Sequence, residues 1–513
     1  MNMGRFLTIN AAKYPQKEAI IFNNKRFTYE EFNKRVNRLA NAFLDMGFKK
    51  GDKISTYLPN CNEHIETLWA LAKIGVGTVP INPGLLGKEM GYYVVQSDSD
   101  GIVFHETLEH QVVKVKDKLQ HVRSSAFIMV GENVPNYGVA YEKLLDQSSD
   151  AEPTTRIKYE IDENDLYYIG YTSGTTGVPK GAYVTHAQRM YHNLALIIEH
   201  NYKEDDIALC AGPLFHAAPK CYTDEVQLMS GGTVVIMPRF HPFEALAFIE
   251  KEKITSTFMA PTMLNFILNL PEEEKTRYNT DSLRTLITGG SALPTRTKEN
   301  ILKIFKNAGL HLFYGSTETG IVTNLRPHDQ LTTTGTSGKT VFGIDMKVMD
   351  EKGMELPRGE IGELYSRGIW TFTGYYKMPE ATKEVFREGW LTVGDIARID
   401  EEGFVYILDR KSDMILRGAE NIYPVGIENV IMSNPAVMEV AVIGVPDEVY
   451  GESVKAVVVL KKGAALTEKE LISFCKENMA KYLVPSSVDF VDSLPKSPAG
   501  KILKKEIRAK YLK

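Results

Sequence analysis

Short strand-like runs alternate with helix-like segments through the first 290 residues, and this alternation limits the folds that the chain can adopt. A strand-like run at 52–60, a helix-like run at 64–75 and a second strand-like run at 78–82 follow one another directly. Further strand-like runs lie at 102–104, 126–130, 233–238, 256–261 and 283–290. Because neighbouring parallel strands need a long crossover connection, usually a helix, the pattern predicts a layered α/β body with largely parallel sheets.

Two segments carry the signature of a capped helix start. Thr28 with Glu31, and Thr467 with Glu470, each place a hydroxyl three residues before a carboxylate and ahead of an apolar helical pattern. Gly47 follows the first of these patterns, at a position where glycine commonly ends a helix. Both segments are therefore predicted to be amphipathic helices.

The pattern changes after about residue 340. Segments at 346–356, 362–368 and 394–410 are typical of β-hairpins, with acidic-glycine turns at 351–353 and 401–403. A chain of 513 residues is too long for one ordinary core, so more than one domain is expected. The predicted fold class is α/β: a large multi-layer N-terminal domain with mixed sheets and a β-rich subdomain, then a small α+β C-terminal domain.

Composition excludes several classes of function. The net charge of −5 gives no general attraction to nucleic acid or to anionic membranes. The four cysteines lie far apart with no C-x-x-C pair, which argues against a zinc site or a disulfide framework and is typical of the reducing cytoplasm. No signal-peptide pattern is visible, and the longest apolar stretch, 68–81, is too interrupted to span a bilayer. We therefore expect a cytoplasmic protein with no nucleic-acid partner and no transmembrane segment.

The stretch YTSGTTGVPKGA, residues 171–182, combines glycines, hydroxyls and a lysine in the manner of a phosphate-binding loop. It does not fit the nucleotide loop G-x-x-x-x-G-K-[ST], because counting from Gly174 puts Pro179 where the second glycine should be. An ordinary P-loop kinase is therefore disfavoured. The residues alone leave open a flexible hairpin turn.

This loop is similar to the signature loop of the adenylate-forming superfamily, which includes acyl-CoA synthetases, luciferases and nonribosomal adenylation domains. The chain also contains segments that resemble the other motifs of the family, in the family's order and over nearly its whole length. These segments are PLFHAAP at 213–219, TGGSALP at 288–294, YGSTETG at 314–320, GWLTVGDIARID at 389–400, LDRKSDMILRGAENIYPVGIE at 408–428 and SLPKSPAGKILKKEIR at 493–508.

The resemblance implies an acyl-CoA synthetase that uses ATP, Mg²⁺ and CoA. A carboxylate attacks the α-phosphorus of ATP to give an acyl-adenylate and diphosphate, and the CoA thiol then displaces AMP. The nucleotide-binding residues implied in this way are Thr172, Ser173, Gly174, Thr175, Thr176, Gly177, Lys180, Gly289, Gly290, Ser291, Tyr314, Gly315, Ser316, Thr317, Asp395 and Arg410. Within that set, the resemblance places Tyr314 on the adenine and both Asp395 and Arg410 on the ribose.

The remaining roles come from the same resemblance. Lys501 is implied to be the catalytic lysine that bridges the carboxylate and the α-phosphate, and His216 to contact the carboxylate or close the acyl pocket. Glu318 and Thr175 are implied to be Mg²⁺ ligands. CoA is implied to pass near 417–419. The residues of that range are Arg417, Gly418 and Ala419.

The family also implies a mobile C-terminal domain. On this basis the chain divides into an AMP-binding adenylation domain at 1–409, a hinge at 410–413 and a mobile domain at 414–513. Lys411 and Ser412 are the expected hinge residues. The family often has Lys or Asp where this chain has Ser412, so the sequence departs from the pattern at that position.

Two sets of charged residues are explained without a role in the reaction. Lys504, Lys505 and Arg508 are expected to lie on a solvated basic helix. Lys220, Asp224 and Glu225 are expected at the surface of the helix after the P-x-x-H segment; otherwise Lys220 could face a polar or dicarboxylic acid, because a buried charge needs a partner.

The expected substrate is a small-molecule carboxylic acid, most simply a medium- or long-chain fatty acid. The alternatives are an aryl-acid CoA ligase, a freestanding adenylation enzyme that loads a carrier protein, a luciferase-like oxygenase and a non-catalytic nucleotide sensor. Retention of Glu318, Asp395, Arg410 and Lys501 together argues against the sensor. A homodimer is possible on the same resemblance.

Overall fold

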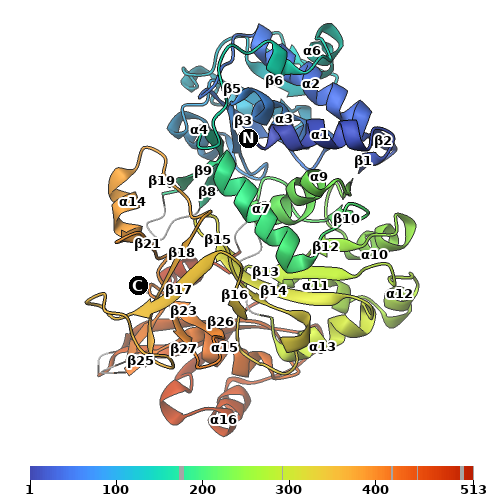
Figure 1. Ribbon diagram of the computed structural model, residues 1–513. Helices are drawn as coiled ribbons and strands as arrows, with labels where there is room; N and C mark the ends of the chain where they lie inside the picture. Colours follow the sequence, from blue (N-terminus) through green and yellow to red (C-terminus); the bar gives the residue numbers. More distant parts are fainter. Residues whose placement is uncertain (173–177, 292, 418–419, 448, 497–501, 512–513) are drawn as a thin grey trace.

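The computed structural model describes residues 1–513 except 173–177, 292, 418–419, 448, 497–501 and 512–513. Figure 1 shows the N-terminal elements at the top of the view and the C-terminal elements at the bottom. Four sheets are assigned within the described residues. The predicted α/β class with mixed sheets is confirmed.

One sheet contains the first strand–helix–strand unit of the sequence. Its order is β19-β9-β8-β4-β3-β5-β6-β7, and the pairs from β8 through β4, β3, β5 and β6 to β7 are parallel. The strands are β3 Lys53–Tyr57, β4 Gly77–Pro80, β5 Gly101–His105, β6 Phe127–Val130, β7 Val139–Ala140, β8 Leu166–Thr172, β9 Lys180–Thr185 and β19 Gly374–Tyr375. The helix expected at 64–75 is α3 (Asn62–Ile74), and Gly75 ends it with φ 70°, in the left-handed region that favours glycine.

A second sheet is parallel over most of its width. Its order is β16-β15-β14-β13-β12-β10-β11-β1-β2, and only the pairs β14–β15, β15–β16 and β1–β2 among these described strands are antiparallel. The strands are β1 Glu18–Phe22, β2 Lys25–Thr28, β10 Ile207–Cys210, β11 Thr233–Ile236, β12 Ser256–Phe258, β13 Thr285–Gly289, β14 Gly309–Ser316, β15 Gly320–Leu325 and β16 Lys339–Thr340. The carboxyl ends of β13 and β14 therefore lie at the same edge of this sheet.

The third sheet is the β-rich part predicted after residue 340. Its strands are β17 Ile344–Met349, β18 Ile361–Gly368, β20 Phe386–Arg387, β21 Trp390–Leu391, β22 Asp395–Ile399 and β23 Val405–Arg410. β22 and β23 form an antiparallel hairpin whose register pairs Asp395 with Arg410. The hairpin thus places these two residues side by side at its open end.

The last hundred residues have a sheet and cores of their own. The strands are β24 Ile415–Arg417, β25 Glu420–Ile422, β26 Val437–Asp447, β27 Gly451–Leu460 and β28 Ser487–Phe490. Two apolar clusters consist only of residues between 415 and 511. This organisation agrees with a separate α+β unit, although the exact boundaries at 409 and 414 stay a prediction.

Helices connect and flank the sheets. They are α1 Gly4–Lys13, α2 Tyr29–Asp45, α4 Gly87–Gln96, α5 Glu109–Val113, α6 Tyr141–Gln147, α7 His186–His200, α8 Ala217–Pro219, α9 Val226–Ser230, α10 Pro242–Lys251, α11 Pro261–Leu268, α12 Glu272–Thr276, α13 Thr295–Ile304, α14 Pro379–Val385, α15 Pro424–Met432, α16 Glu468–Asn478 and α17 Lys504–Ala509. Both predicted capping boxes are present, at Thr28 before α2 and at Thr467 before α16. Across the described residues, every helix is too short or too polar to cross a membrane.

Candidate active site

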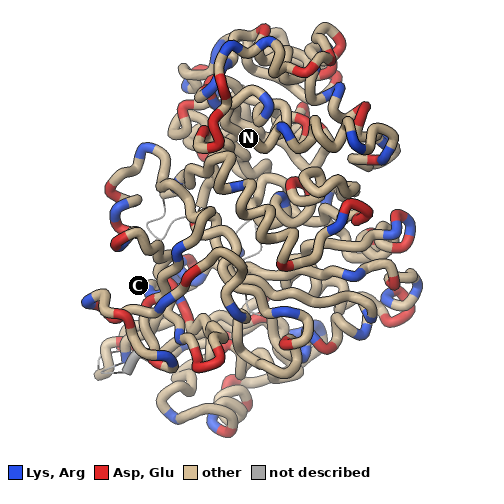
Figure 2. The backbone as a smooth tube through the Cα atoms, viewed as in Figure 1, with Lys and Arg blue, Asp and Glu red and all other residues tan. Residues whose placement is uncertain are grey.

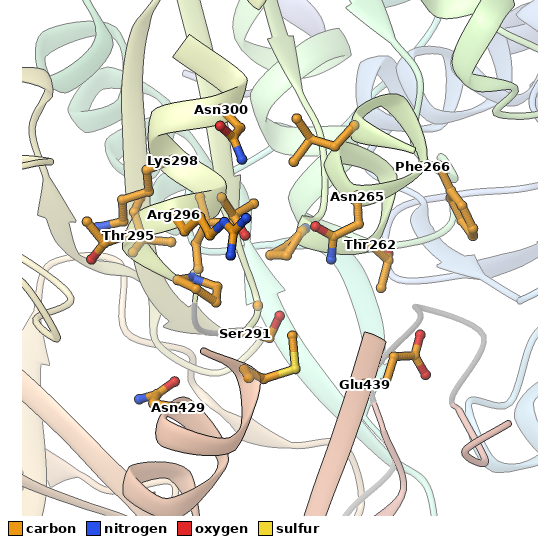
Figure 3. A pocket seen from close by; sticks show the side chains of 18 of the residues that line it. Thr262, Asn265, Phe266, Ser291, Thr295, Arg296, Lys298, Asn300, Asn429 and Glu439 are labelled. Carbon is orange, nitrogen blue, oxygen red and sulfur yellow. The ribbon is translucent and has the colours of Figure 1, made fainter. Parts of the chain in front are cut away.

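A cavity of about 1450 Å³ lies between the large body and the C-terminal unit. Figure 3 shows side chains of α11 and α13 on one side of it and Asn429 of α15 and Glu439 of β26 on the other. Several residues predicted to bind the nucleotide line this cavity. They are Gly290, Ser291, Tyr314, Gly315, Ser316, Asp395 and Arg410.

The centre of this group is a contact between Tyr314 and Asp395. The Tyr314 hydroxyl donates a hydrogen bond to Asp395 Oδ2, and Arg410 Nε lies 3.5 Å from Asp395 Oδ1. Burial, together with the neighbouring Asp395 carboxylate, raises the pKa of Tyr314 well above its ordinary value, so the phenol stays a donor. Each oxygen of Asp395 retains acceptor capacity beyond these contacts, which suits a partner with two hydroxyl donors.

The turn after β14 requires its glycines. A Cβ on Gly315 would lie 2.0 Å from the Gly320 carbonyl oxygen. Gly320 has φ 63°, and a Cβ there would lie 2.6 Å from the ring of His192. Inside the turn, Ser316 N donates to Thr319 Oγ1 at 2.8 Å. The turn is therefore held closely between β14, β15 and helix α7.

Glu318 projects from this turn onto the phosphate-loop strands. Its side chain is buried, and Oε1 accepts hydrogen bonds from the Tyr375 hydroxyl at 2.9 Å and from Thr172 Oγ1 at 3.2 Å. Lys180 Nζ lies 5.2 Å from the centroid of the Tyr375 ring. The structure thus brings Glu318 to Thr172 and Lys180, although Glu318 is 146 positions from Thr172 in the sequence. Tyr375 joins them, and sequence reasoning missed it.

The donor set fits a hard divalent cation that takes most of its ligands from phosphate and water. The described residues hold no group of three or more His, Cys, Asp or Glu side chains that could bind a metal alone. A single carboxylate, Glu318, beside the hydroxyl of Thr172 matches the one or two protein oxygens that Mg²⁺ uses in nucleotide sites.

Several predicted residues lie outside the described residues. They are Ser173, Gly174, Thr175, Thr176, Gly177, Gly418, Ala419 and Lys501. Their borders are nevertheless defined: Thr172 pairs with Lys180 across the antiparallel strands β8 and β9, so a hairpin carries the loop. Lys496 and Ile502, on either side of 497–501, both line the cavity.

The structure describes other predicted site residues that do not line the cavity. Gly289 ends β13, and Thr317 lies in the turn between β14 and β15. His216 precedes α8, and burial lowers the pKa of its imidazole, which favours the neutral form. Arg417 lies on β24, where it donates to the Tyr482 carbonyl at 2.9 Å and its guanidinium lies 5.0 Å from the Tyr450 ring centroid.

The expectation that Lys220, Asp224 and Glu225 are surface residues is wrong. All three are at most 1% exposed, on a π-helical segment, Lys220–Glu225, between α8 and α9. Lys220 Nζ donates to Glu225 Oε1 at 2.9 Å, and the Tyr167 hydroxyl donates to the same oxygen at 2.7 Å. Burial, reinforced by Glu225, raises the pKa of Asp224 well above its ordinary value. The partner of Lys220 is therefore within the protein.

The expectation of a solvated basic helix near the C-terminus is wrong for Lys504. Its side chain is 16% exposed, and Nζ lies 2.9 Å from Glu428 and 3.8 Å from Asp409. Asp409 Oδ2 also accepts a hydrogen bond from Val425 N at 3.0 Å. Arg508 contacts Glu452, whereas Lys505 is exposed as expected.

The two expected hinge residues differ in their contacts and exposure. Lys411 Nζ pairs with Glu363 at 3.1 Å, and Lys411 N donates to the Gly394 carbonyl at 2.8 Å, which ties it to the third sheet. Ser412 is exposed. The Asp409–Lys504–Glu428 contacts, which sequence reasoning missed, join the end of β23 to α15 and α17.

Comparisons with known proteins identify a family that covers both parts of the chain. Residues 7–376 match the model of the AMP-binding enzyme family, and residues 426–501 match that of the AMP-binding enzyme C-terminal domain. The chain is 35% identical to a feruloyl-CoA synthase of Amycolatopsis over 99% of both chains. It is 32% identical to the long-chain-fatty-acid–CoA ligase FadD13 of Mycobacterium tuberculosis, over 99% of this chain and 98% of that one.

Solved structures show the same relationship. ATP-bound MatB from Rhodopseudomonas palustris superimposes with a TM-score of 0.89 at 29% identity, covering 100% of this chain and 99% of that chain. Both parts of the chain, the large body and the C-terminal unit, are included in this match. The chain therefore belongs to the AMP-binding enzyme family and is an ATP-dependent, AMP-forming acid–thiol ligase.

Proposed function

We propose that the cavity adenylates a monocarboxylic acid with an apolar acyl or aryl tail and that Lys501 serves only this first step. The observation that carries the proposal is the Tyr314–Asp395–Arg410 group at the cavity. Asp395 suits the two ribose hydroxyls as an acceptor, and Arg410, 3.5 Å away, orients its carboxylate. This arrangement orients the nucleotide so that its α-phosphate meets the attacking carboxylate.

The remaining residues neutralise and position charge. Lys180 and the loop between Thr172 and Lys180 hold the phosphates that leave as diphosphate. Glu318, with Thr175, would hold Mg²⁺, which supplies neutralisation of phosphate charge when bound. The attacking carboxylate is already ionised near neutral pH, so no general base is needed. Lys501 is proposed to lie between the carboxylate and the α-phosphate, since both flanking residues that the structure describes line the cavity.

The buried Lys220–Glu225 pair supports the proposal that the substrate carries one carboxylate and no second charge. Lys220 is satisfied by Glu225, so it is not available to a second carboxylate of the substrate. The feruloyl-CoA synthase and the fatty-acid–CoA ligase similar to this chain are named for an aryl acid and a long-chain acid. The four cysteines are buried and free, which supports a reducing compartment such as the cytoplasm.

The test measures the two half-reactions separately. Diphosphate release is screened over fatty, aryl and dicarboxylic acids, with and without CoA as the sole acceptor. Lys501→Ala is expected to lower adenylation by at least ~10²-fold, the scale for losing one oriented charge-stabilising donor. Thioester formation from preformed acyl-adenylate should change far less. Lys505→Ala, an exposed lysine nearby, is the matched control.

If Lys501→Ala slowed adenylation and thioester formation equally, Lys501 would not serve the first step alone. Preference for dicarboxylic acids would overturn the proposed substrate class. Thioester formation only with a carrier protein, and none with CoA, would favour the freestanding adenylation enzyme.

A further inference from the structure

Strand β15 begins at an irregular point of the mostly parallel sheet, directly after the turn that carries Glu318. The register between β14 and β15 shifts between Tyr314 and Gly315, and Gly315 pairs with Ile321 at this point. Irregularities of this kind redirect side chains and are common beside active sites. Here, side chains from two other parts of the chain bind both polar groups of the Ile321 backbone.

The imidazole of His192 binds the amide of Ile321. His192 Nε2 accepts a hydrogen bond from Ile321 N at 3.1 Å, and the side chain is buried. Burial, with Arg189 nearby, lowers the pKa of His192 to about 3, so the ring is neutral and keeps one nitrogen as an acceptor. Figure 1 shows α7, the helix of His192, crossing the middle of the molecule, and Figure 2 shows few charged residues along its path. The acceptor is therefore present throughout the neutral range of pH.

Trp370 binds the carbonyl of the same residue. Its Nε1 donates a hydrogen bond to the Ile321 carbonyl at 3.2 Å, and its ring meets that of His192 edge to face, with the centroids 5.9 Å apart. The two rings also enclose Gly320: a Cβ there would lie 2.6 Å from His192 Cδ2 and 2.8 Å from Trp370 Cδ1. The backbone just after the turn is therefore closely packed and has little room to shift.

The segment that begins with Trp370 also contacts Glu318 itself. Phe372 N donates to the Glu318 carbonyl at 3.1 Å. The Tyr375 hydroxyl donates to Glu318 Oε1 at 2.9 Å. Segment 370–375 therefore contacts both the backbone and the carboxylate of Glu318, as well as the residue that follows the turn.

Helix α7 binds segment 370–375 through a second residue. Gln188 Nε2 donates to the Thr371 carbonyl at 2.6 Å and lies 3.3 Å from Thr373 Oγ1. Gln188 and His192 are four positions apart, the spacing at which side chains share one face of a helix. The same face of α7 therefore holds the turn through His192 and the neighbouring segment through Gln188.

We propose that His192 is a positioning residue for Mg²⁺: with Trp370 it fixes the backbone of Ile321, and this keeps the carboxylate of Glu318 beside the phosphate-loop strands. The inference rests on the proposed role of Glu318 as the Mg²⁺ ligand. The Nε2 lone pair is engaged by Ile321 N, so the ring acts through the backbone and not as a ligand itself. Because Mg²⁺ demands short bonds and near-octahedral geometry, a shift of the turn should weaken the binding of Mg²⁺ more than that of the nucleotide.

The test measures how much Mg²⁺ tightens the binding of ATP. Isothermal titration calorimetry without an acid substrate gives the Kd for ATP in magnesium and in EDTA. His192→Leu removes the acceptor and should raise the Kd in magnesium by at least ~10-fold, the scale for groups that orient a metal ligand, while the Kd in EDTA changes far less. His192→Gln offers an amide oxygen to Ile321 N and should restore most of the affinity.

Trp370→Phe is a second, milder variant of the same contact. It keeps an aromatic ring and loses the donor to the Ile321 carbonyl, so it should also raise the Kd in magnesium more than the Kd in EDTA. If His192→Leu does not fold, Trp370→Phe decides the test by the same comparison.

His186 provides the matched control. It lies on the same helix, is buried, and accepts a hydrogen bond from the amide of Met3 at 3.2 Å. Burial lowers its pKa to about 4 as well. His186→Leu should lower the free energy of unfolding as His192→Leu does, because each change leaves a buried N–H without its acceptor, but it should leave both Kd values unchanged. Urea unfolding measures the stability of each variant.

The inference is overturned if His192→Leu raises both Kd values equally, or raises the Kd in magnesium no more than His186→Leu does. It is also overturned if His192→Gln binds as weakly as His192→Leu, because the hydrogen bond from Ile321 N would then not be the cause. Glu318→Gln separates the inference from the proposed function. If Glu318→Gln leaves the Kd in magnesium unchanged, Glu318 is not the ligand and both fail. If it weakens binding in magnesium and His192→Leu does not, only the positioning role fails.

Discussion

The phenol of Tyr314 donates a hydrogen bond to the carboxylate of Asp395, although 81 positions separate the two residues in the chain. Tyr314 comes from the end of β14 in the mostly parallel sheet, and Asp395 begins β22 in the β-rich sheet. The contact therefore joins two sheets at the wall of the cavity. It also holds Asp395 in place from one side while Arg410 approaches from the other.

Removing this contact should weaken ATP binding. Tyr314→Phe leaves a buried carboxylate oxygen without its donor, a loss of about 1–3 kcal/mol. We expect the KM for ATP to rise by roughly 5- to 100-fold, with a smaller change in the KM for the acid. Steady-state diphosphate release measures both. Tyr406→Phe, on the neighbouring strand β23, is the control, and equal effects of the two changes would contradict a specific role for Tyr314.

Glu318 should set the dependence of the reaction on Mg²⁺. Glu318→Gln keeps the shape of the side chain and can still accept from Tyr375, but it removes the negative charge that attracts a cation. We expect half-maximal adenylation to need at least ~10-fold more Mg²⁺ than in wild type, on the scale of one charged ligand. A magnesium titration of diphosphate release measures the shift. Glu355→Gln, at an exposed position, should leave the titration curve unchanged; an unshifted curve for Glu318→Gln would exclude it as a ligand.

Local signals in the sequence predicted much of the fold and part of the site. The Thr28 capping box, helix α3 with Gly75 at its end, and the β22–β23 hairpin depend on residues close in sequence, and the structure confirms each. The pairing of Asp395 with Arg410 followed from the hairpin and its resemblance to a known motif.

Interactions between distant segments could not be predicted in the same way. Lys220 and Glu225 look like surface charges because their burial is decided by the strand that carries Tyr167 and Tyr168 beneath them. Tyr375 gave no local signal either, since its role depends on the pairing of the two-residue strand β19 with β9. The expectation that Lys220 and Glu225 lie at the surface was wrong because tertiary packing, and not the local sequence pattern, determines whether a charged side chain is buried.

Breaking the buried contact between Lys220 and Glu225 should lower stability. Lys220→Met removes the donor to Glu225 Oε1 but leaves Arg189 Nε 3.4 Å from Oε2, so we expect a loss of about 1–3 kcal/mol in the free energy of unfolding. Combining Lys220→Met with Glu225→Gln should cost less than the sum of the two single changes, because the two groups interact directly. Urea unfolding measures the two single variants and the double variant.

The exposed pair Lys13–Glu204 provides the comparison. Lys13→Met should change the free energy of unfolding by less than about 1 kcal/mol, as for other surface ion pairs. If the double change at Lys220 and Glu225 were as destabilising as the sum of its single changes, the two groups would not be coupled as the structure indicates.

Asp409 should make stability depend on pH in the direction opposite to most carboxylates. Burial raises the pKa of Asp409 from its ordinary value to about 6, even though Lys504 lies nearby. Between these values the folded protein keeps a proton that the unfolded chain has lost. Stability therefore falls as pH rises through this window, by roughly 3 kcal/mol in all, at about 1.4 kcal/mol for each pH unit.

Asp409→Asn removes the titrating group, so its stability relative to wild type should increase from about pH 4 to pH 7. Asp447 provides a control that titrates outside this window, because backbone N–H donors from Tyr450 and Val449 lower its pKa below its ordinary value. Its contribution is fully present above its ordinary pKa and is lost only as the pH falls through the lowered pKa, so the stability of Asp447→Asn relative to wild type should stay nearly constant from about pH 4 to pH 7. Urea unfolding of the three proteins across this range measures the slopes. If the difference in unfolding free energy between wild type and Asp409→Asn did not change with pH, Asp409 would be ionised across the whole range. The attraction of Lys504 would then outweigh the effect of burial.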